Sequence, residues 1–236
     1  MIRIAAVGDI HMSEEARGSL RPHVAALKEH VDALLLAGDL THIGRLEEAE
    51  VLAGELEGAP VPVIAVLGNH DYHRGKADAI RETLERVGVT MLEGESITLE
   101  VRGRTLGIAG VKGFCGGFKG SHGHKFGEPE RKAFIQAADD AALALETQLR
   151  ALRADHRVAL LHYAPVRDTV EGERPELFPY LGAYQLGDAI DRAGADLALH
   201  GHAHYGSIKG VTSGGIPVGN VAMPVIRRPY MIYTLP

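Results

Sequence analysis

The stretch IRIAAVGDIH, residues 2–11, is a short apolar run that ends in a polar cluster. The same arrangement recurs in ALLLAGDLTH (33–42), VIAVLGNHDYH (63–73), RVALLHYAP (157–165) and DLALHGHAH (196–204). Continuous apolar runs of this length are typical of strands that are buried on both faces. The sequence therefore predicts a buried sheet whose strands end in polar side chains.

Helical patterns separate the first of these runs, at residues 19–31, 45–57 and 75–87. The alternation of strands with helices predicts βαβ units and a largely parallel sheet. In such sheets the functional groups gather beyond the carboxyl ends of the strands. The polar clusters fall at this edge of the predicted sheet.

The second half of the chain has a different pattern. Residues 96–111, SITLEVRGRTLGIAGV, alternate around RGR at 102–104 and predict an antiparallel hairpin, while 205–235 predict short strands joined by Gly and Pro turns. Between them lie a glycine-rich loop at about 112–128 and an amphipathic helical pattern near 129–153. We therefore expect a second sheet and a mixed α/β fold.

Composition limits the function classes. A chain of 236 residues can bury a sizeable core, and it contains no linker or low-complexity tract, so we expect one domain over 1–236. The net charge of −6 argues against a broad basic face for nucleic acid or membrane. The single cysteine, Cys115, excludes an internal disulfide and a cysteine-based zinc site.

The first residues, MIRIAAVGD, start a strand and lack the features of a signal peptide. No apolar run reaches the roughly 18 to 20 residues of a membrane span. We therefore expect a reduced, cytoplasmic location and no membrane partner, while the oligomeric state stays open.

The segment LHGHAH, residues 199–204, contains three of the 13 histidines. Side chains at i and i+2 of an extended segment point the same way, so His200, His202 and His204 would share one face. Histidine is the commonest metal ligand near neutral pH. From this segment alone, the alternative to metal binding is that each histidine is an ordinary core or surface residue.

The other strand ends add carboxylate, amide and imidazole groups. Each one alone would fit ordinary turn chemistry. Together they indicate a metal site, because buried carboxylates and imidazoles need partners that cations supply. In chain order, the candidate residues are Asp9, His11, Asp39, Asn69, His70, Asp71, His162, His202 and His204.

The ordered blocks GDIH, GDLT, GNHD, H and GHAH, spread over residues 8–204, resemble the calcineurin-like metallophosphoesterase superfamily. The resemblance implies a four-layer αββα fold, in which two packed mixed sheets are flanked by helices, and a two-metal site at the strand ends. It implies that the first metal is held by Asp9, His11 and His204, the second by Asn69, His162 and His202, and both by Asp39.

The chemistry agrees with this ligand set. Two divalent cations roughly 3.5–4 Å apart can bind a phosphate, lower the pKa of a bridging water and stabilise the charge of an in-line displacement. A bridging carboxylate keeps the two cations close. We expect two divalent ions per chain, Mn²⁺, Fe²⁺/Fe³⁺ or Zn²⁺, with Mn²⁺ favoured, since Mg²⁺ prefers oxygen ligands.

His70 is not a metal ligand in this pattern. Its position after Asn69 suits a general acid toward the leaving-group oxygen, with Asp71 orienting the ring. A strand-end cap is the alternative for His70. We interpret His200 as a supporting residue, either a hydrogen-bond partner of a ligand or a packed imidazole.

The chain departs from the G-D-x-x-D-R-G pattern of the protein serine/threonine phosphatases, because GDLTHIG has His42 and Ile43 in place of Asp and Arg. This favours the small bacterial-type phosphodiesterase-like members and a small, nucleotide-like phosphate ester. We expect the loops at 112–128 and 165–184 to choose the substrate. Their candidate residues are Lys112, Phe114, Phe118, Lys119, His122, His124, Arg167, Phe178, Tyr180 and Tyr184.

Three alternatives remain open. The first is a phosphomonoesterase, since other monoesterases also lack the arginine. The second is a non-catalytic scaffold of the same fold, like the retromer subunit, although such scaffolds tend to lose ligands that this chain has. The third is a DNA-end nuclease, for which an acidic chain of 236 residues has little room.

Overall fold

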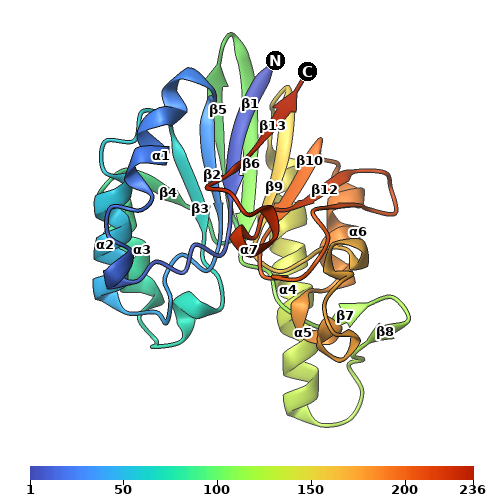
Figure 1. Ribbon diagram of the computed structural model, residues 1–236. Helices are drawn as coiled ribbons and strands as arrows, with labels where there is room; N and C mark the ends of the chain where they lie inside the picture. The colour runs from blue at the N-terminus through green and yellow to red at the C-terminus, as the bar shows by residue number, and fades with distance from the viewer.

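The computed structural model describes residues 1–236, except for the side chain of Glu29. Two sheets pack against each other in the middle of the molecule, and helices cover both outer faces (Figure 1). In spatial order, the first sheet contains β13 (Met231–Leu235), β1 (Ile2–Val7), β2 (Ala33–Ala37), β3 (Val63–Val66) and β4 (Val89–Met91). The second contains β11 (Lys209–Val211), β12 (Pro217–Asn220), β10 (Leu197–His200), β9 (His156–Leu161), β6 (Arg104–Val111) and β5 (Glu95–Val101). The predicted αββα layering is confirmed.

Strand β1 shows why the apolar runs are continuous. Ile2 and Ile4 face the core between the two sheets, whereas Ala5 and Val7 face the core beneath the helices. Side chains of successive strand residues point to opposite faces, and here both faces are covered. The strands β1, β2, β3 and β4 pair in parallel, and β13 adds an antiparallel edge.

The second sheet contains the predicted hairpin. Strands β5 and β6 pair antiparallel from Glu95 opposite Gly110 to Val101 opposite Arg104. Arg102 and Gly103 make the turn with φ of 52° and 78°, a conformation that a two-residue hairpin loop requires. The strands β6, β9, β10 and β12 are parallel neighbours.

The helices form the two outer layers (Figure 1). On the first sheet lie α1 (Arg21–Ala25), α2 (Leu46–Leu56) and α3 (Ala77–Glu85), and on the second lie α4 (Pro129–Ala151) and α6 (Tyr184–Ala193). The pattern at 19–31 gives only a five-residue α-helix and the 3-10 turn η2 (Ala26–Glu29). The turn ends at Glu29, and the amide of Asp32, just before β2, bonds the carbonyl of Arg3 in β1.

The remaining short elements lie at one end of the molecule, beyond the carboxyl ends of β1, β2, β9 and β10, and the two termini lie at the other end (Figure 1). They are β7 (Gly117–Phe118), β8 (Ser121–His122), α5 (Phe178–Leu181), α7 (Met223–Ile226) and the 3-10 turns η1 (Glu14–Ala16), η3 (His70–Tyr72), η4 (Arg167–Val170) and η5 (Pro175–Leu177). Among the described residues, no helix is both long enough and apolar enough to cross a bilayer.

Candidate metal centre

The candidate ligands come from both sheets and converge at this end of the molecule. Asp9 and His11 follow β1, Asp39 follows β2, and Asn69 follows β3. From the second sheet, His162 follows β9, and His202 and His204 follow β10. Backbone hydrogen bonds join the loops: the amide of Asp9 donates to Gly38 O at 2.9 Å, and that of His11 to Asp39 O at 3.0 Å.

The backbone around the site is strained. Six non-glycine residues of the chain have φ in the left-handed region, and four of them are candidate ligands. These are Asp9 at 56°, His11 at 46°, Asp39 at 48° and His202 at 69°. Such conformations cost about 1–3 kcal/mol each and persist where the surrounding structure holds them, most often at functional sites. The fold therefore maintains the directions of these side chains against local preference.

One group of potential ligand atoms is formed by Asp9, His11 and His204, which lie within 4.8 Å of one another. The Nε2 atom of His204 is 2.9 Å from Oδ1 of Asp9 and 3.4 Å from Nε2 of His11. The backbone amide of His202 donates to both carboxylate oxygens of Asp9, at 3.0 and 2.8 Å. The carboxylate is thus fixed between the two sheets.

A second group consists of Asp39, His162 and His202, again with atoms within 4.8 Å. The Nε2 atom of His162 lies 3.3 Å from Oδ1 of Asp39 and 2.9 Å from Oδ1 of Asn69. The other oxygen of Asp39, Oδ2, is 3.8 Å from Nε2 of His11. Asp39 therefore touches both groups, which is the position that a bridging ligand needs.

The electrostatics of the site fit divalent cations. Burial lowers the pKa of His11 to about 4 and those of His162 and His202 to about 3, which leaves the imidazoles neutral, the form that binds metal. Asp9 and Asp39 are 2% and 1% exposed. Among the described side chains, no lysine or arginine lies within 4 Å of either carboxylate, and burial raises the pKa of Asp9 to about 6. At His204 the hydrogen bond to Asp9 instead raises the pKa of the imidazole. Buried carboxylates beside three neutral imidazoles form a donor set with room for positive charge.

A family model described as calcineurin-like phosphoesterase matches residues 2–206. The chain belongs to the calcineurin-like phosphoesterase family. The family uses a dinuclear divalent metal centre, and the chain is a metal-dependent phosphoesterase. Comparison with curated protein sequences gives no match.

Solved structures share the calcineurin-like phosphoesterase fold at low sequence identity. GAP50, the anchor in the inner membrane complex of Plasmodium, is 14% identical with a TM-score of 0.59, over 94% of this chain and 72% of that one. A Thermus thermophilus protein is 17% identical with a TM-score of 0.54, over 93% and 88%. A Staphylococcus aureus protein provisionally named as a 5'-nucleotidase, in complex with alpha-ketoglutarate, is 17% identical with a TM-score of 0.59, over 93% of this chain and 48% of that one. These likenesses show the fold alone.

His70 of this phosphoesterase lies at the start of η3, next to the centre. Its backbone amide donates to Oδ1 of Asp39 at 2.9 Å, and its Nε2 atom is 3.8 Å from Oδ2 of the same carboxylate. The Nδ1 atom makes a short hydrogen bond with the carbonyl of His42. The side chain is 39% exposed, so Nε2 faces the centre from the solvent side.

The structure corrects the role expected for Asp71. The ring of His70 has the carbonyl of His42 as its partner, and Asp71 is fully buried. Its carboxylate accepts hydrogen bonds from the amides of Leu40, Thr41 and Gly68 and from the Thr41 hydroxyl. Successive side chains of a 3-10 turn point about 120° apart, so Asp71 is directed into the protein while His70 faces the centre. Asp71 holds the loops after β2 and β3 together.

His200 lies behind the ligands. It is fully buried, and its two ring nitrogens lie 2.7 Å from the carbonyl of Gly201 and 2.7 Å from the Thr169 hydroxyl. Burial lowers its pKa to about 4. The neutral ring packs beneath the loop that carries His202, which is the supporting position that the sequence suggested.

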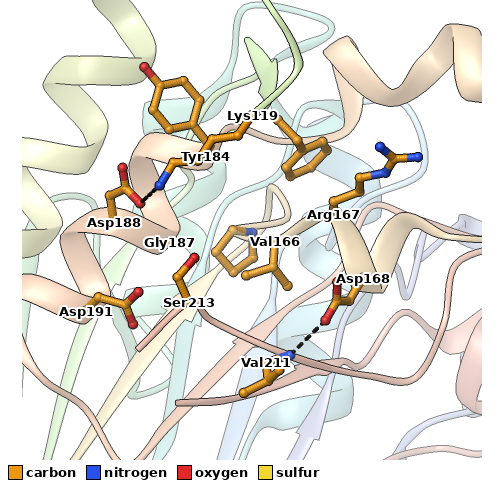
Figure 2. A pocket seen from close by; sticks show the side chains of 12 residues that line it. Lys119, Val166, Arg167, Asp168, Tyr184, Gly187, Asp188, Asp191, Val211 and Ser213 are labelled. Carbon is orange, nitrogen blue, oxygen red and sulfur yellow. Dashed lines mark hydrogen bonds and ion pairs between the residues drawn. The ribbon is translucent and has the colours of Figure 1, made fainter. Parts of the chain in front are cut away.

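The residues expected to choose the substrate divide into two regions. Lys112 and Tyr180 lie near the centre, and the carbonyl of Tyr180 is 3.2 Å from Nε2 of His202. Lys119, Arg167 and Tyr184 instead line a pocket of about 170 Å³ on the side of α6 (Figure 2). As far as the described residues show, the lining of this pocket includes none of the candidate metal ligands.

His122 and His124, which repeat the H-x-H spacing, lie on the β7–β8 ribbon. Their ring centroids are 4.5 Å apart, and the ring of His122 is 4.8 Å from that of Tyr184. Within the described residues, the groups with metal-ligand spacing contain neither of them. The ring of His122 is partly buried against Tyr184, whereas His124 is exposed.

Sequence reasoning missed Tyr72 and Tyr163. The ring of Tyr163 is 4.5 Å from that of His202 and 5.4 Å from that of His162, and Tyr72 belongs to η3 together with His70. Their adjacency in the sequence to His162 and Asp71 was a usable signal. The ring of Tyr163 lies beside the candidate ligands, and the ring of Tyr72 lies beside Lys112.

Proposed function

We propose that two divalent ions occupy this centre, one at each of the two ligand groups, with Asp39 between them. The observation that carries this proposal is the convergence of buried carboxylates and imidazoles from two sheets, with the potential ligand atoms of each group within 4.8 Å of one another. When bound, two divalent ions supply Lewis-acid stabilisation of phosphoryl oxygens and lower the pKa of water. The proposed ligands are Asp9, His11, Asp39, Asn69, His162, His202 and His204.

We further propose that His70 donates the proton to the leaving group. With Nδ1 bonded to the His42 carbonyl, Nε2 is the nitrogen that faces the centre. A protonated ring keeps the bond from Nδ1–H to the carbonyl while it donates from Nε2. General-acid catalysis of this kind contributes typically about 10²- to 10⁴-fold.

The substrate that we favour is a small, nucleotide-like phosphodiester. His42 and Ile43 replace the residues that the protein phosphatases use on phosphomonoesters, and the aromatic rings of Tyr72, Phe114 and Tyr163 near the centre offer surfaces on which a base can stack. A small-molecule phosphomonoester is the second candidate, because the S. aureus protein with this fold is named as a nucleotidase. The ion that we favour is Mn²⁺, because Mn²⁺ accepts imidazole ligands more readily than Mg²⁺, which prefers oxygen ligands.

The test is to reconstitute the purified protein with Mn²⁺ and to measure both metal content and hydrolysis of bis(p-nitrophenyl) phosphate and p-nitrophenyl phosphate. We expect close to two ions per chain, faster diester hydrolysis, loss of activity with chelator, and better recovery with Mn²⁺ than with Mg²⁺. The Asp39→Asn variant should bind fewer ions. Turnover of the monoester only would replace the diester proposal, and a stoichiometry of one or none, unchanged in Asp39→Asn, would contradict the two-ion centre.

A further inference from the structure

Lys112 follows β6 and is attached to the strand end that carries a proposed ligand. Its carbonyl accepts hydrogen bonds from the backbone amides of His162 and Tyr163, both at 3.0 Å. Its own amide donates to Oε1 of Glu93 at 3.2 Å. The backbone of Lys112 is therefore fixed on both sides, so its side chain starts from a defined place beside the centre.

The ammonium group of Lys112 lies among three aromatic rings. Its Nζ atom is 4.7 Å from the ring centroid of Tyr72, 5.3 Å from that of Phe114 and 5.6 Å from that of Tyr163. Among the described side chains, no carboxylate lies within 4 Å of this ammonium. Aromatic faces stabilise a cation but leave its N–H donors available, because an ammonium has three of them and the rings offer no strong acceptor.

The aromatic rings connect this ammonium to both halves of the centre. Tyr72 lies in η3, two residues after His70 on the side of the first sheet. Tyr163 lies on the side of the second sheet, and its ring centroid is 5.6 Å from Nζ of Lys112 and 4.5 Å from the ring of His202. The half-buried ammonium, with no described carboxylate within 4 Å, is thus connected through these rings to the residues of the metal site.

Lys119 provides the comparison within the same chain. It also lies over an aromatic ring, 5.8 Å from the centroid of Tyr184, but its Nζ atom is 2.7 Å from Oδ1 of Asp188 (Figure 2). A lysine with a structural role has its charge balanced in this way. Lys112 has no carboxylate of a described side chain within 4 Å of its ammonium, and the carboxylates that act on its charge from farther away are Glu93 and the proposed ligand Asp39.

We propose that Lys112 forms an anion-binding subsite at the rim of the metal centre, which takes a phosphoryl group of the substrate. This inference rests on the proposed function of the centre. The segment GDLTHIG has Ile43 where the protein serine/threonine phosphatases have an arginine. The ammonium of Lys112 supplies a cationic contact to phosphate from a different position in the fold. A fixed cation in a partly desolvated place makes a strong charge-assisted hydrogen bond to a phosphoryl oxygen.

The experiment uses inorganic phosphate as the probe, titrated calorimetrically into the manganese-loaded protein. Lys112→Met, which keeps an apolar chain among the rings, should weaken phosphate binding about 10- to 100-fold, the effect expected for one charge-assisted hydrogen bond. Lys112→Arg should retain most of the affinity. Lys132→Met, an exposed position on α4 outside the residues expected to choose the substrate, is the control and should bind phosphate like the unmodified protein. Metal content and thermal unfolding are measured on each preparation.

Unchanged phosphate affinity in Lys112→Met would overturn the proposal, and so would a loss of affinity that follows a loss of metal. If Lys112→Met does not fold, the comparison of Lys112→Arg with Lys112→Gln serves the same purpose, since only the arginine keeps the charge. Pyrophosphate is titrated in parallel. If Lys112→Met loses more affinity for pyrophosphate than for phosphate, Lys112 contacts a phosphoryl group next to the reacting one. If the two losses are equal, Lys112 contacts the reacting phosphoryl group itself. Neither the phosphate nor the pyrophosphate titration depends on diester turnover. Failure of the diester proposal can therefore be distinguished from failure of the Lys112 proposal.

Discussion

His70 presents one ring nitrogen to the centre, while a backbone carbonyl fixes the other. A general acid matters most when the leaving group is a poor one, because a p-nitrophenolate ion departs without a proton. We therefore predict that His70→Asn loses about 10²- to 10⁴-fold in kcat on an alkyl or nucleoside ester and much less on a p-nitrophenyl ester. Both are measured at full metal occupancy. Equal losses on the two kinds of ester would remove the acid role.

Asp71→Asn is the control for this experiment. The amide would place an NH₂ group against N–H donors of Leu40, Thr41 or Gly68, which costs about 1–3 kcal/mol when a buried hydrogen bond is lost. We expect a lower free energy of unfolding in urea and an unchanged ratio between the two esters. A changed ratio of the two rates in this variant would indicate that Asp71 does orient the ring of His70.

The same two residues show what spacing along the sequence can predict about a site. The convergence of the candidate ligands could be predicted because each follows a buried strand, and the ends of parallel strands meet at one edge. Their binding of metal remains a prediction. The hydrogen-bond partner of the His70 ring could not be predicted from the sequence, because the direction of a side chain in η3 depends on the geometry of the turn. The cation–aromatic cluster around Lys112 was equally hidden, since its members come from three separate loops.

Among the secondary-structure elements, α1 depends on a single carboxylate of α2. Glu55 is buried, and it accepts hydrogen bonds from the backbone amides of Gly18, Leu20 and Arg21 at 2.6, 2.9 and 2.7 Å. These amides precede or begin α1, where the helix itself supplies no acceptor. Burial alone would raise the pKa of Glu55, but the three donors lower it overall.

We predict that Glu55→Gln lowers the free energy of unfolding at pH 7 by about 1–3 kcal/mol. Because the pKa is lower in the folded than in the unfolded state, the stabilisation is complete above the unfolded value of 4.5 and is lost as the pH falls through the folded value. The difference between the two proteins in urea unfolding should therefore shrink below pH 4.5. Glu57→Gln, at the exposed end of the same helix, is the control. A difference that grows with acidity would contradict this account.

The elements also differ in how far the sequence determines them. Strands β1, β2, β3, β5, β6, β9 and β10 and helices α2, α3 and α4 follow from apolar periodicity, with ends within a few residues of the prediction, whereas β4 and α6 were not predicted. The β7–β8 ribbon inside residues 112–128 does not, because two-residue strands exist only through distant contacts. The amide of Gly117, for example, bonds the carbonyl of Gly182. The substrate-choosing role of this loop remains a prediction.

At the scale of the whole molecule, the candidate centre joins the two sheets. Asp9, Asp39 and Asn69 extend from the first sheet, and His162 and His202 extend from the second. A cation that binds ligands of both sheets is bound only when the sheets are packed together, so it stabilises the folded state by mass action. It also relieves the cost of the buried carboxylates and of the strained backbone, which the metal-free protein has to bear.

We therefore predict that Mn²⁺ raises the thermal unfolding midpoint and that a chelator reverses the change. At a free concentration 1,000-fold above the dissociation constant, one bound ion contributes about 4 kcal/mol, or roughly 8–16 °C for a chain of this size. Scanning calorimetry with and without chelator measures the shift. Asp39→Asn should lose most of the shift, whereas Asp155→Asn, whose carboxylate bonds only Thr105 far from the centre, should keep it. An equal shift in both variants would place the stabilising ion elsewhere, since, among the described residues, Asp39 belongs to two of the groups of potential ligands and Asp155 to none.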